Sequence, residues 1–158
     1  MKKIIFILII LIYSNLICYA KIKNEYLIVP NGQIGAIRLY DVAYNINTIL
    51  KTSPDQVNED YFGYFALYDN YELGILYDRT YKVRVIICKS TYFKDIYDLG
   101  VGSDINDVMN CYLGGSLDKD TYFCLNRGIS FAFNRRNKVT GITIFDPGYV
   151  DFILNPGR

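Results

Sequence analysis

Leu99-Gly-Val-Gly-Ser-Asp-Ile-Asn-Asp-Val-Met-Asn-Cys-Tyr-Leu-Gly-Gly115 is the stretch that decides the fold of this chain. Ser103 suits the N-cap position of a helix, because its hydroxyl can accept a hydrogen bond from a free N–H of the first turn. Apolar residues then recur at helical spacing, namely Ile105, Val108, Met109 and Tyr112. The pattern predicts a short helix with one apolar stripe that ends at the Gly114-Gly115 pair.

Three extended segments follow this predicted helix. Residues 122–125 and 128–133 are rich in aromatic and β-branched residues, and Ile129, Phe131 and Phe133 alternate with smaller residues. Residues 134–138 predict a polar turn, and residues 139–145 predict the last strand. The whole unit therefore consists of a helix and three strands.

The earlier part of the chain predicts a looser version of the same unit. Its segments are, in order, two extended pieces, a helix, a loop and three strands: 26–29, 34–39, 41–50, 55–60, 61–68, 71–77 and 81–88. The connections between the three strands are so short that only antiparallel hairpins fit. We predict an α+β fold of tandem helix plus three-stranded antiparallel meander units, with the helices packed on one face of an antiparallel sheet.

The two units also match weakly in sequence. Ile37, Val42 and Ile46 correspond to Ile96, Val101 and Ile105 at a constant spacing. We therefore predict internal repeats at about residues 37–88 and 96–145, with chance similarity as the alternative, because few of the aligned residues are identical.

Residues 1–20 have the pattern of a bacterial secretory signal peptide. Lys2 and Lys3 give a positive start, residues 4–12 are an unbroken apolar run, and Ala20 is a small residue at a cleavage site. The alternatives are an uncleaved membrane anchor and lipidation of Cys18. We predict cleavage after Ala20, one domain over residues 21–158 with no stable membrane span, and a periplasmic or secreted location.

Charge and cysteine content bear on the class of ligand and on the state of the cysteines. The chain has 17 Lys and Arg against 16 Asp and Glu, without the basic cluster that nucleic-acid binding needs. Cleavage leaves Cys88, Cys111 and Cys124, and with an odd number at least one thiol stays free or pairs with another molecule. Cys111 and Cys124 flank one loop, so we predict a disulfide between them, with Cys88 as a buried thiol.

The stretch 99–115, followed by Gly128-Ile-Ser-Phe-Ala-Phe133 and Asn137-Lys-Val-Thr-Gly-Ile-Thr-Ile144, resembles the repeat of the β-lactamase-inhibitor-protein-like domains. It is similar also to the outer-membrane assembly lipoproteins of the SmpA/OmlA type. The resemblance implies an exported α+β repeat domain that binds other proteins at or outside the inner membrane.

Catalytic motifs are absent from the sequence. There is no histidine, which excludes Ser-His and Cys-His catalysis and the usual zinc sites. The cysteines lack the CxxC spacing of a redox site, and the acidic clusters lack the spacing of a calcium loop. We expect no enzyme activity, no cofactor and no metal, and a carboxylate-dependent hydrolase is the enzymatic alternative.

The excess of tyrosine, 16 residues in the chain, is the strongest functional signal, because tyrosine is enriched at protein interfaces. Strand parity predicts that Leu73, Ile75, Val83, Val85 and Ile87 share the buried face of the sheet. The opposite face would then carry the contact with a partner. Its predicted contact residues are Tyr64, Tyr68, Lys82 and Arg84.

We therefore predict an exported, non-enzymatic protein-binding module, with inhibition of a target protein as one form of that activity. The alternative is an envelope-assembly or structural component at the outer membrane. We expect another protein as the partner, and we expect neither nucleic acid nor a small molecule as a ligand.

Overall fold

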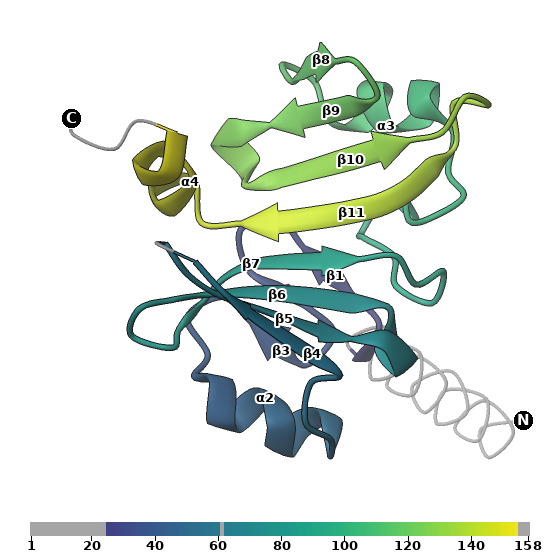
Figure 1. Cartoon of the computed structure of the whole chain (residues 1–158). Coiled ribbons are helices and arrows are strands. Elements are labelled where there is room, and N and C mark those ends of the chain that lie inside the picture. Colours follow the sequence, from purple (N-terminus) through teal and green to yellow (C-terminus); the bar gives the residue numbers. More distant parts are fainter. Residues whose placement is uncertain (1–24, 61, 155–158) are drawn as a thin grey trace, which may run out of the picture.

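The structure is a computed structural model that describes residues 25–60 and 62–154 (Figure 1). The predicted signal peptide and Cys18 lie outside the described residues. Three short strands come first, followed by a helix: β1 (Ile28–Val29), β2 (Gln33–Ile34), β3 (Ile37–Arg38) and α2 (Ala43–Leu50). Four longer strands follow, with the 3-10 turn η1 (Asp69–Tyr71) in their midst: β4 (Gln56–Glu59), β5 (Gly63–Tyr68), β6 (Leu73–Asp78) and β7 (Val83–Cys88).

Helix α3 (Ile105–Cys111) then leads into a second set of four strands, again with a 3-10 turn, η2 (Leu125–Arg127). These strands are β8 (Ser116–Asp118), β9 (Thr121–Cys124), β10 (Ile129–Phe133) and β11 (Val139–Phe145). Helix α4 (Pro147–Leu154) closes the described part of the chain.

One eight-stranded sheet dominates the molecule, in the order β4-β5-β6-β7-β11-β10-β9-β8. Every neighbouring pair is antiparallel, as the short hairpin connections predicted. Strands β7 and β11 meet at the centre, and β4 and β8 form the two edges. Each set of four strands thus builds one half of the sheet.

The small sheet β1-β2-β3 packs behind the large one (Figure 1). Ile28 and Ile34 of the small sheet, Ile46 of α2 and Val108 of α3 join one hydrophobic core with the large sheet. We call the face of the large sheet that this layer covers the inner face and the opposite one the outer face. Burial of apolar side chains along the inner face supplies most of the stabilisation of such a two-layer fold.

The predicted fold class is wrong. The molecule is mostly β, and each half of the large sheet has four strands instead of three. Residues 56–59 and 116–118, which are exposed and mostly polar, pair as edge strands, whereas the sequence predicted a loop at 55–60 and no strand at 116–118. The helices are too short to form a layer of their own: α2 buries Ile46 and Leu50, and α3 buries Val108.

A β-bulge in the β6–β7 hairpin makes part of the prediction wrong that assigned the residues of β7 to the buried face. Val83 lies in the core opposite Tyr77, but the register shifts there, so that Ile86 and Cys88 face inward after it. Val85 and Ile87 consequently point to the outer face, where the sequence placed them inside. A bulge has this effect because it inserts one residue into a pattern of period two.

Similar hydrogen bonds recur in the two halves. Asp78 N–H donates to Lys82 O at 2.9 Å in the first hairpin, and Asn134 N–H donates to Lys138 O at 3.0 Å in the second. The register of both hairpins also shifts near their turns. The predicted boundaries of an internal duplication stay a prediction.

The start of α3 differs by one residue from the prediction. Its N-cap is Asp104, whose carboxylate accepts from Asn106 N–H at 3.0 Å, whereas the Ser103 hydroxyl accepts from Gly100 N–H. Across the described ranges, no helix is both long and apolar enough to cross a membrane.

Candidate functional site

The structure separates the four predicted contact residues and does not place them on one exposed face. Tyr68 is 1% exposed and belongs to the core, so its prediction as an exposed contact residue is wrong. The reason is the direction of β5, whose alternate residues Tyr64, Ala66 and Tyr68 point to the inner side toward α2. Tyr64 is half-buried and stays accessible.

Arg84 is also less available than predicted. Its Nε and Nη1 each lie 2.8 Å from a carboxylate oxygen, of Asp78 and Asp146 respectively, and its side chain is half-buried. The rings of Tyr40 and Tyr149 lie within 4.9 and 5.6 Å of its guanidinium carbon. Lys82 is exposed in the β6–β7 turn. Neither cation lines the site that contains Tyr64 and Tyr68.

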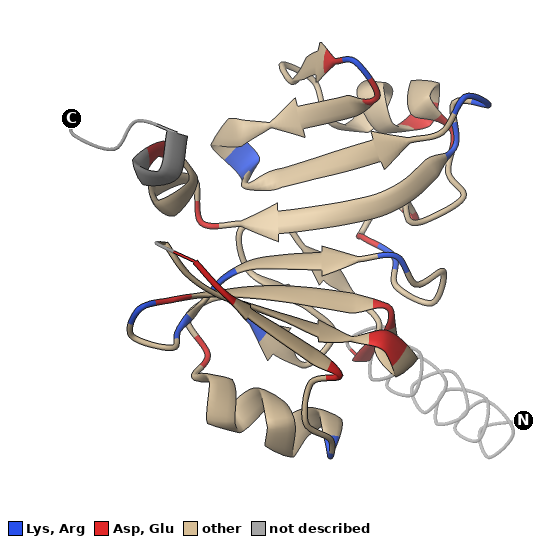
Figure 2. Cartoon of the chain, in the orientation of Figure 1, with Lys and Arg blue, Asp and Glu red and all other residues tan. Residues whose placement is uncertain are grey.

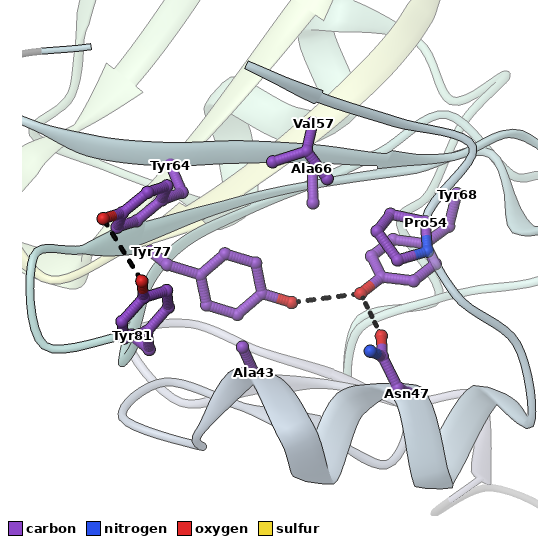
Figure 3. Close-up of a pocket in the computed structure, with 9 residues that line it drawn as sticks. All are labelled: Ala43, Asn47, Pro54, Val57, Tyr64, Ala66, Tyr68, Tyr77 and Tyr81. Carbon is purple, nitrogen blue, oxygen red and sulfur yellow. Dashed lines mark hydrogen bonds between the residues drawn. The ribbon is translucent and has the colours of Figure 1, made fainter. Parts of the chain in front are cut away.

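That site is a pocket of about 170 Å³ between α2, β4, β5 and the β6–β7 hairpin, which we call the tyrosine pocket (Figure 3). Its lining residues carry no formal charge and most of them are apolar or aromatic: Ala43, Asn47, Pro54, Val57, Tyr64, Ala66, Tyr68, Tyr77 and Tyr81. Strands β5 and β6 and the β6–β7 turn contribute the aromatic rings, and α2 contributes Ala43 and Asn47.

A chain of hydrogen bonds fixes the two inner tyrosines. Tyr68 Oη donates to Asn47 Oδ1 at 2.8 Å, and the hydroxyls of Tyr68 and Tyr77 lie 3.3 Å apart (Figure 3). Burial raises the pKa of both phenols above the ordinary value of 10.0. Both phenols therefore stay neutral at physiological pH, and their rings are held in place as a preformed wall.

The outer wall of the pocket is a stacked pair. The rings of Tyr64 and Tyr81 lie 4.7 Å apart and are nearly parallel, and Tyr81 Oη donates to Tyr64 Oη at 3.3 Å. Arg79 lies beside this pair, with its guanidinium carbon 5.9 Å from the Tyr64 ring centre and an ion pair to Glu59 at 2.7 Å. The mouth of the pocket is thus aromatic and is flanked by one exposed ion pair.

The pocket opens beside a free sheet edge. Within residues 25–60 and 62–154, strand β4 pairs with β5 on one side alone, and all four of its residues are exposed. Val57 of β4 pairs with Ala66 and shares its inner side, where both line the pocket. An unpaired edge carries backbone N–H and C=O groups that can bind a further strand.

This arrangement suits binding better than catalysis. The lining offers aromatic faces, aliphatic carbon and hydroxyl groups, but no carboxylate, thiol or amine. Burial raises the pKa of the Tyr68 and Tyr77 phenols above 10.0, so these two hydroxyls stay protonated near neutral pH. In the described ranges, no group of three or more Cys, Asp or Glu side chains is placed to hold a metal ion.

Sequence reasoning singled out Tyr64 and Tyr68 as partner contacts on the face away from the helices, but they line a pocket on the side of α2, and the other lining residues were missed. Tyr77 carried a usable signal, because the short hairpin pairs Tyr64 directly with Tyr77. Tyr81 carried none, since it lies in the turn with a left-handed φ of 60°. Asn47 lies on one face of α2, and no sequence pattern indicates that this face borders a pocket. Val57 lies on the edge strand β4, which the sequence did not predict.

The predicted disulfide is absent. Cys88, Cys111 and Cys124 are all free thiols, and Cys124 is buried with its Sγ 3.6 Å from the carbonyl oxygen of Tyr112. Burial raises the pKa of the Cys88 thiol to about 11, which keeps it unreactive.

Comparison with known proteins gives little beyond this geometry. No family model matches the chain. No curated protein matches it either. Among solved structures, an extracellular protein containing an SCP domain from Bacillus anthracis str. Ames aligns with 78% of this chain and 52% of its own, at 9% identity and a TM-score of 0.40. The chain therefore spans about half the length of that structure, and the likeness is too weak to show a shared fold.

Proposed function

We propose that this chain is an exported, non-enzymatic module that binds another protein by holding an extended segment of it along β4, with one apolar side chain in the tyrosine pocket. The observation that carries the proposal is the position of Val57. This residue belongs to the exposed edge strand and at the same time lines the pocket. A strand added to β4 would run directly beside the pocket mouth.

Strand addition explains how such a site gains both affinity and specificity. The main chain of the bound segment would pair with the free backbone groups of β4, which gives affinity for an extended conformation. Side chains of a strand alternate between two faces, so every second side chain of the segment would point toward the pocket. The pocket would then select the residue at one position.

The size and lining of the pocket favour one side chain as its occupant. Pockets for drug-sized ligands have volumes of about 300 to 1,000 Å³, whereas a cavity of about 150 Å³ accepts a benzene ring. The tyrosine pocket, at about 170 Å³, matches a single ring or branched aliphatic group. Its uncharged aromatic wall supports Phe, Leu or Pro over a charged residue.

A panel of capped peptides tests this function. Each peptide would be a short Thr-Val alternation with Phe, Leu or Ala at one central position, and isothermal titration calorimetry with the purified chain would give the dissociation constants. We expect the Phe and Leu peptides to bind about tenfold more tightly than the Ala peptide, because the pocket buries the larger side chain.

Two matched variants assign the effect to the pocket. Tyr64→Ala removes part of the pocket wall and is expected to abolish the preference for Phe and Leu. Tyr44→Ala changes a 79% exposed tyrosine on α2 that does not line the pocket, and is expected to leave the preference unchanged. Equal binding of the Phe and Ala peptides, or equal behaviour of the two variants, would contradict the proposal.

A further inference from the structure

The helix and the hairpin turn of each half of the molecule meet through the same backbone hydrogen bond. At the start of α2, Ala43 N–H donates to Tyr81 O at 3.0 Å. At the start of α3, Ile105 N–H donates to Asn137 O at 3.0 Å. Tyr81 and Asn137 both have a left-handed φ, of 60° and 58° respectively. These two places are therefore structurally equivalent.

Strand pairing extends the equivalence to the two edges of the large sheet. The edge strands β4 and β8 pair with β5 and β9 in the same way, and the hairpins β6–β7 and β10–β11 have register shifts at matching positions. Five residues that line the tyrosine pocket thus have counterparts in the second half, in the pairs Ala43 and Ile105, Val57 and Leu117, Tyr64 and Asp120, Tyr77 and Phe133, and Tyr81 and Asn137.

A second pocket lies at these counterparts. It has a volume of about 460 Å³, and we call it the β8 pocket. Its lining residues include all of the counterparts and add three polar residues of the adjoining turns: Ile105, Leu117, Lys119, Asp120, Phe133, Asn134, Arg135 and Asn137. The second half of the molecule therefore has a pocket where the first half has the tyrosine pocket.

The two pockets differ in charge. An ion pair between Arg79 and Glu59 flanks the tyrosine pocket. Arg135 occupies the turn position that matches Arg79, but Lys119 occupies the position that matches Glu59, two residues after the pocket-lining residue of the edge strand. In the part of the chain that the structure describes, neither Lys119 nor Arg135 forms an ion pair. With Asp120 also in the lining, the β8 pocket has a net positive charge.

Apolar and amide groups complete the β8 pocket. The cations lie in the β8–β9 and β10–β11 turns, which are blue in Figure 2. The Asn134 Oδ1 accepts from Arg136 N–H at 2.9 Å and from Lys138 N–H at 3.2 Å, which leaves its amide nitrogen as a donor for a ligand. The apolar part of the lining consists of Ile105, Leu117 and Phe133. Cations and an amide donor beside apolar carbon suit a carboxylate on an aliphatic stem.

We propose that β8 is a second docking edge, which binds an extended segment of a partner protein with an acidic side chain in the β8 pocket. Leu117 carries this proposal, because it belongs to the exposed strand β8 and also lines the pocket. Across the described residues, β8 pairs with β9 alone, so its other side is open to a further strand. The proposal rests on the mode of binding proposed for β4, but it depends on different residues.

Charge complementarity decides the occupant and separates the two edges. The uncharged tyrosine pocket favours an apolar side chain, whereas the net positive lining of the β8 pocket favours an acidic one. Because β4 and β8 are opposite edges of one sheet, the chain would hold two segments of different sequence at the same time.

A matched pair of capped peptides tests the second edge. Both would be a short Thr-Val alternation, with either Glu or its neutral isostere Gln at one central position. Isothermal titration calorimetry at low ionic strength is expected to show about fivefold tighter binding of the Glu peptide, since exposed ion pairs are individually weak. Added salt should reduce this preference, because it screens exposed charges. Equal binding of the Glu and Gln peptides would overturn the proposal.

Variants of the lining assign the preference to the β8 pocket. Lys119→Gln and Arg135→Gln should each reduce the preference for Glu, and Asp120→Asn should increase it, because a repelling carboxylate is removed. Arg136→Gln is the matched control, since Arg136 is exposed in the same turn but does not line the pocket. An equal effect of Arg136→Gln and Arg135→Gln would reduce the binding to general attraction and overturn the proposal.

Two N-methylated versions of the Glu peptide test whether the segment pairs as a strand. Successive N–H groups of a strand point to opposite sides, so only those on one side can donate to β8. Methylation of every second residue in one register should abolish binding, and methylation in the other register should not. Equal effects of the two registers would contradict strand addition at β8.

The same measurements separate this proposal from the one for β4. Tyr64→Ala, which should abolish the preference for Phe and Leu, is expected to leave the preference for Glu unchanged. Loss of the Glu preference alone would refute the second edge and leave the tyrosine pocket as proposed. A chain that binds none of the peptides would refute strand addition at both edges.

Discussion

Arg84 illustrates how a single side chain changes its role when its surroundings are known. The sequence predicted an exposed cation for partner contact, but Arg84 joins Asp78 of β6 to Asp146 after β11, with Tyr40 and Tyr149 beside it. These four residues come from three segments that are far apart in the sequence, because Asp146 and Tyr149 are near neighbours. A half-buried cation that is paired twice holds its partners together, and removal of either partner leaves charge without full compensation.

Asp78 gives this cluster a measurable pH dependence. Burial by itself raises the pKa of its carboxyl, but hydrogen bonds from Thr80, Arg84 and backbone N–H groups outweigh burial and lower the pKa from 3.8 to about 2. A lowered pKa in the folded state stabilises the protein above the unfolded value, and this contribution disappears as the pH falls from about 4 to about 2.

We therefore expect Asp78→Asn to lower the free energy of unfolding by about 2 kcal/mol at pH 7, and to flatten the further loss between pH 4 and pH 2. Urea unfolding at several pH values measures both effects. Asp118→Asn, at an exposed position on β8, is the control and should change neither. An unchanged acid dependence in Asp78→Asn would refute the role assigned to this carboxylate.

At the scale of elements, the two edge strands are the strands that hydrophobic alternation in the sequence does not predict. Strands β4 and β8 have one apolar residue each, Val57 and Leu117, and are too short to show the alternation that identifies a half-buried strand. What makes them strands is pairing with β5 and β9, which are already held by the core. A sequence with little apolar content can therefore extend a sheet when its neighbour supplies the template.

Gly63 limits how closely β5 and β6 approach. It begins β5 opposite Asp78, and a Cβ at this position would overlap the carbonyl oxygen of Tyr77. We expect Gly63→Ala to lower the free energy of unfolding by more than about 2 kcal/mol, because the backbone of the hairpin must move apart.

Gly141→Ala is the matched control for this substitution. It lies in β11, where the nearest atoms to an added Cβ are 3.8 Å away, and its effect should stay within about 0.5 kcal/mol. Thermal or urea unfolding of the two variants measures the difference. Similar free energies of unfolding for the two variants would show that the β5–β6 hairpin accommodates the added methyl group without loss of stability.

At the scale of the whole molecule, the core is compatible with removal of the predicted leader. Ile28 is the first residue of the hydrophobic core, so a cut after Ala20 would remove no core side chain that the structure describes. The same core extends through both halves of the large sheet, which makes the described part of the chain one structural unit.

We expect the chain made in a bacterial host to begin at Lys21, as determined by N-terminal sequencing of the exported protein. Ala20→Tyr should block cleavage, because signal peptidase sites need small residues, while Cys18→Ser should have no effect. A protein that still begins at Met1 contradicts the export prediction, and an effect of Cys18→Ser would favour lipidation.

The sequence by itself determined the order of the hairpins and the inner positions of most strands. Alternation placed Leu73, Ile75 and Tyr77 on one buried face, and short polar turns required antiparallel pairing. These features are local, because strand periodicity and turn length depend on residues that are neighbours in the chain.

Only the tertiary structure decided the edge strands, the inward and outward positions along β7, and the tyrosine pocket. Each depends on register between segments distant in sequence, and one bulge in β7 moved Val85 and Ile87 to the opposite face. The pocket likewise needs α2, β4 and β5 together, since Asn47, Val57 and Tyr64 have no common pattern in the sequence. A period of two fixes which residues share a face, but the packing of the second layer decides which face is buried and where a cavity remains.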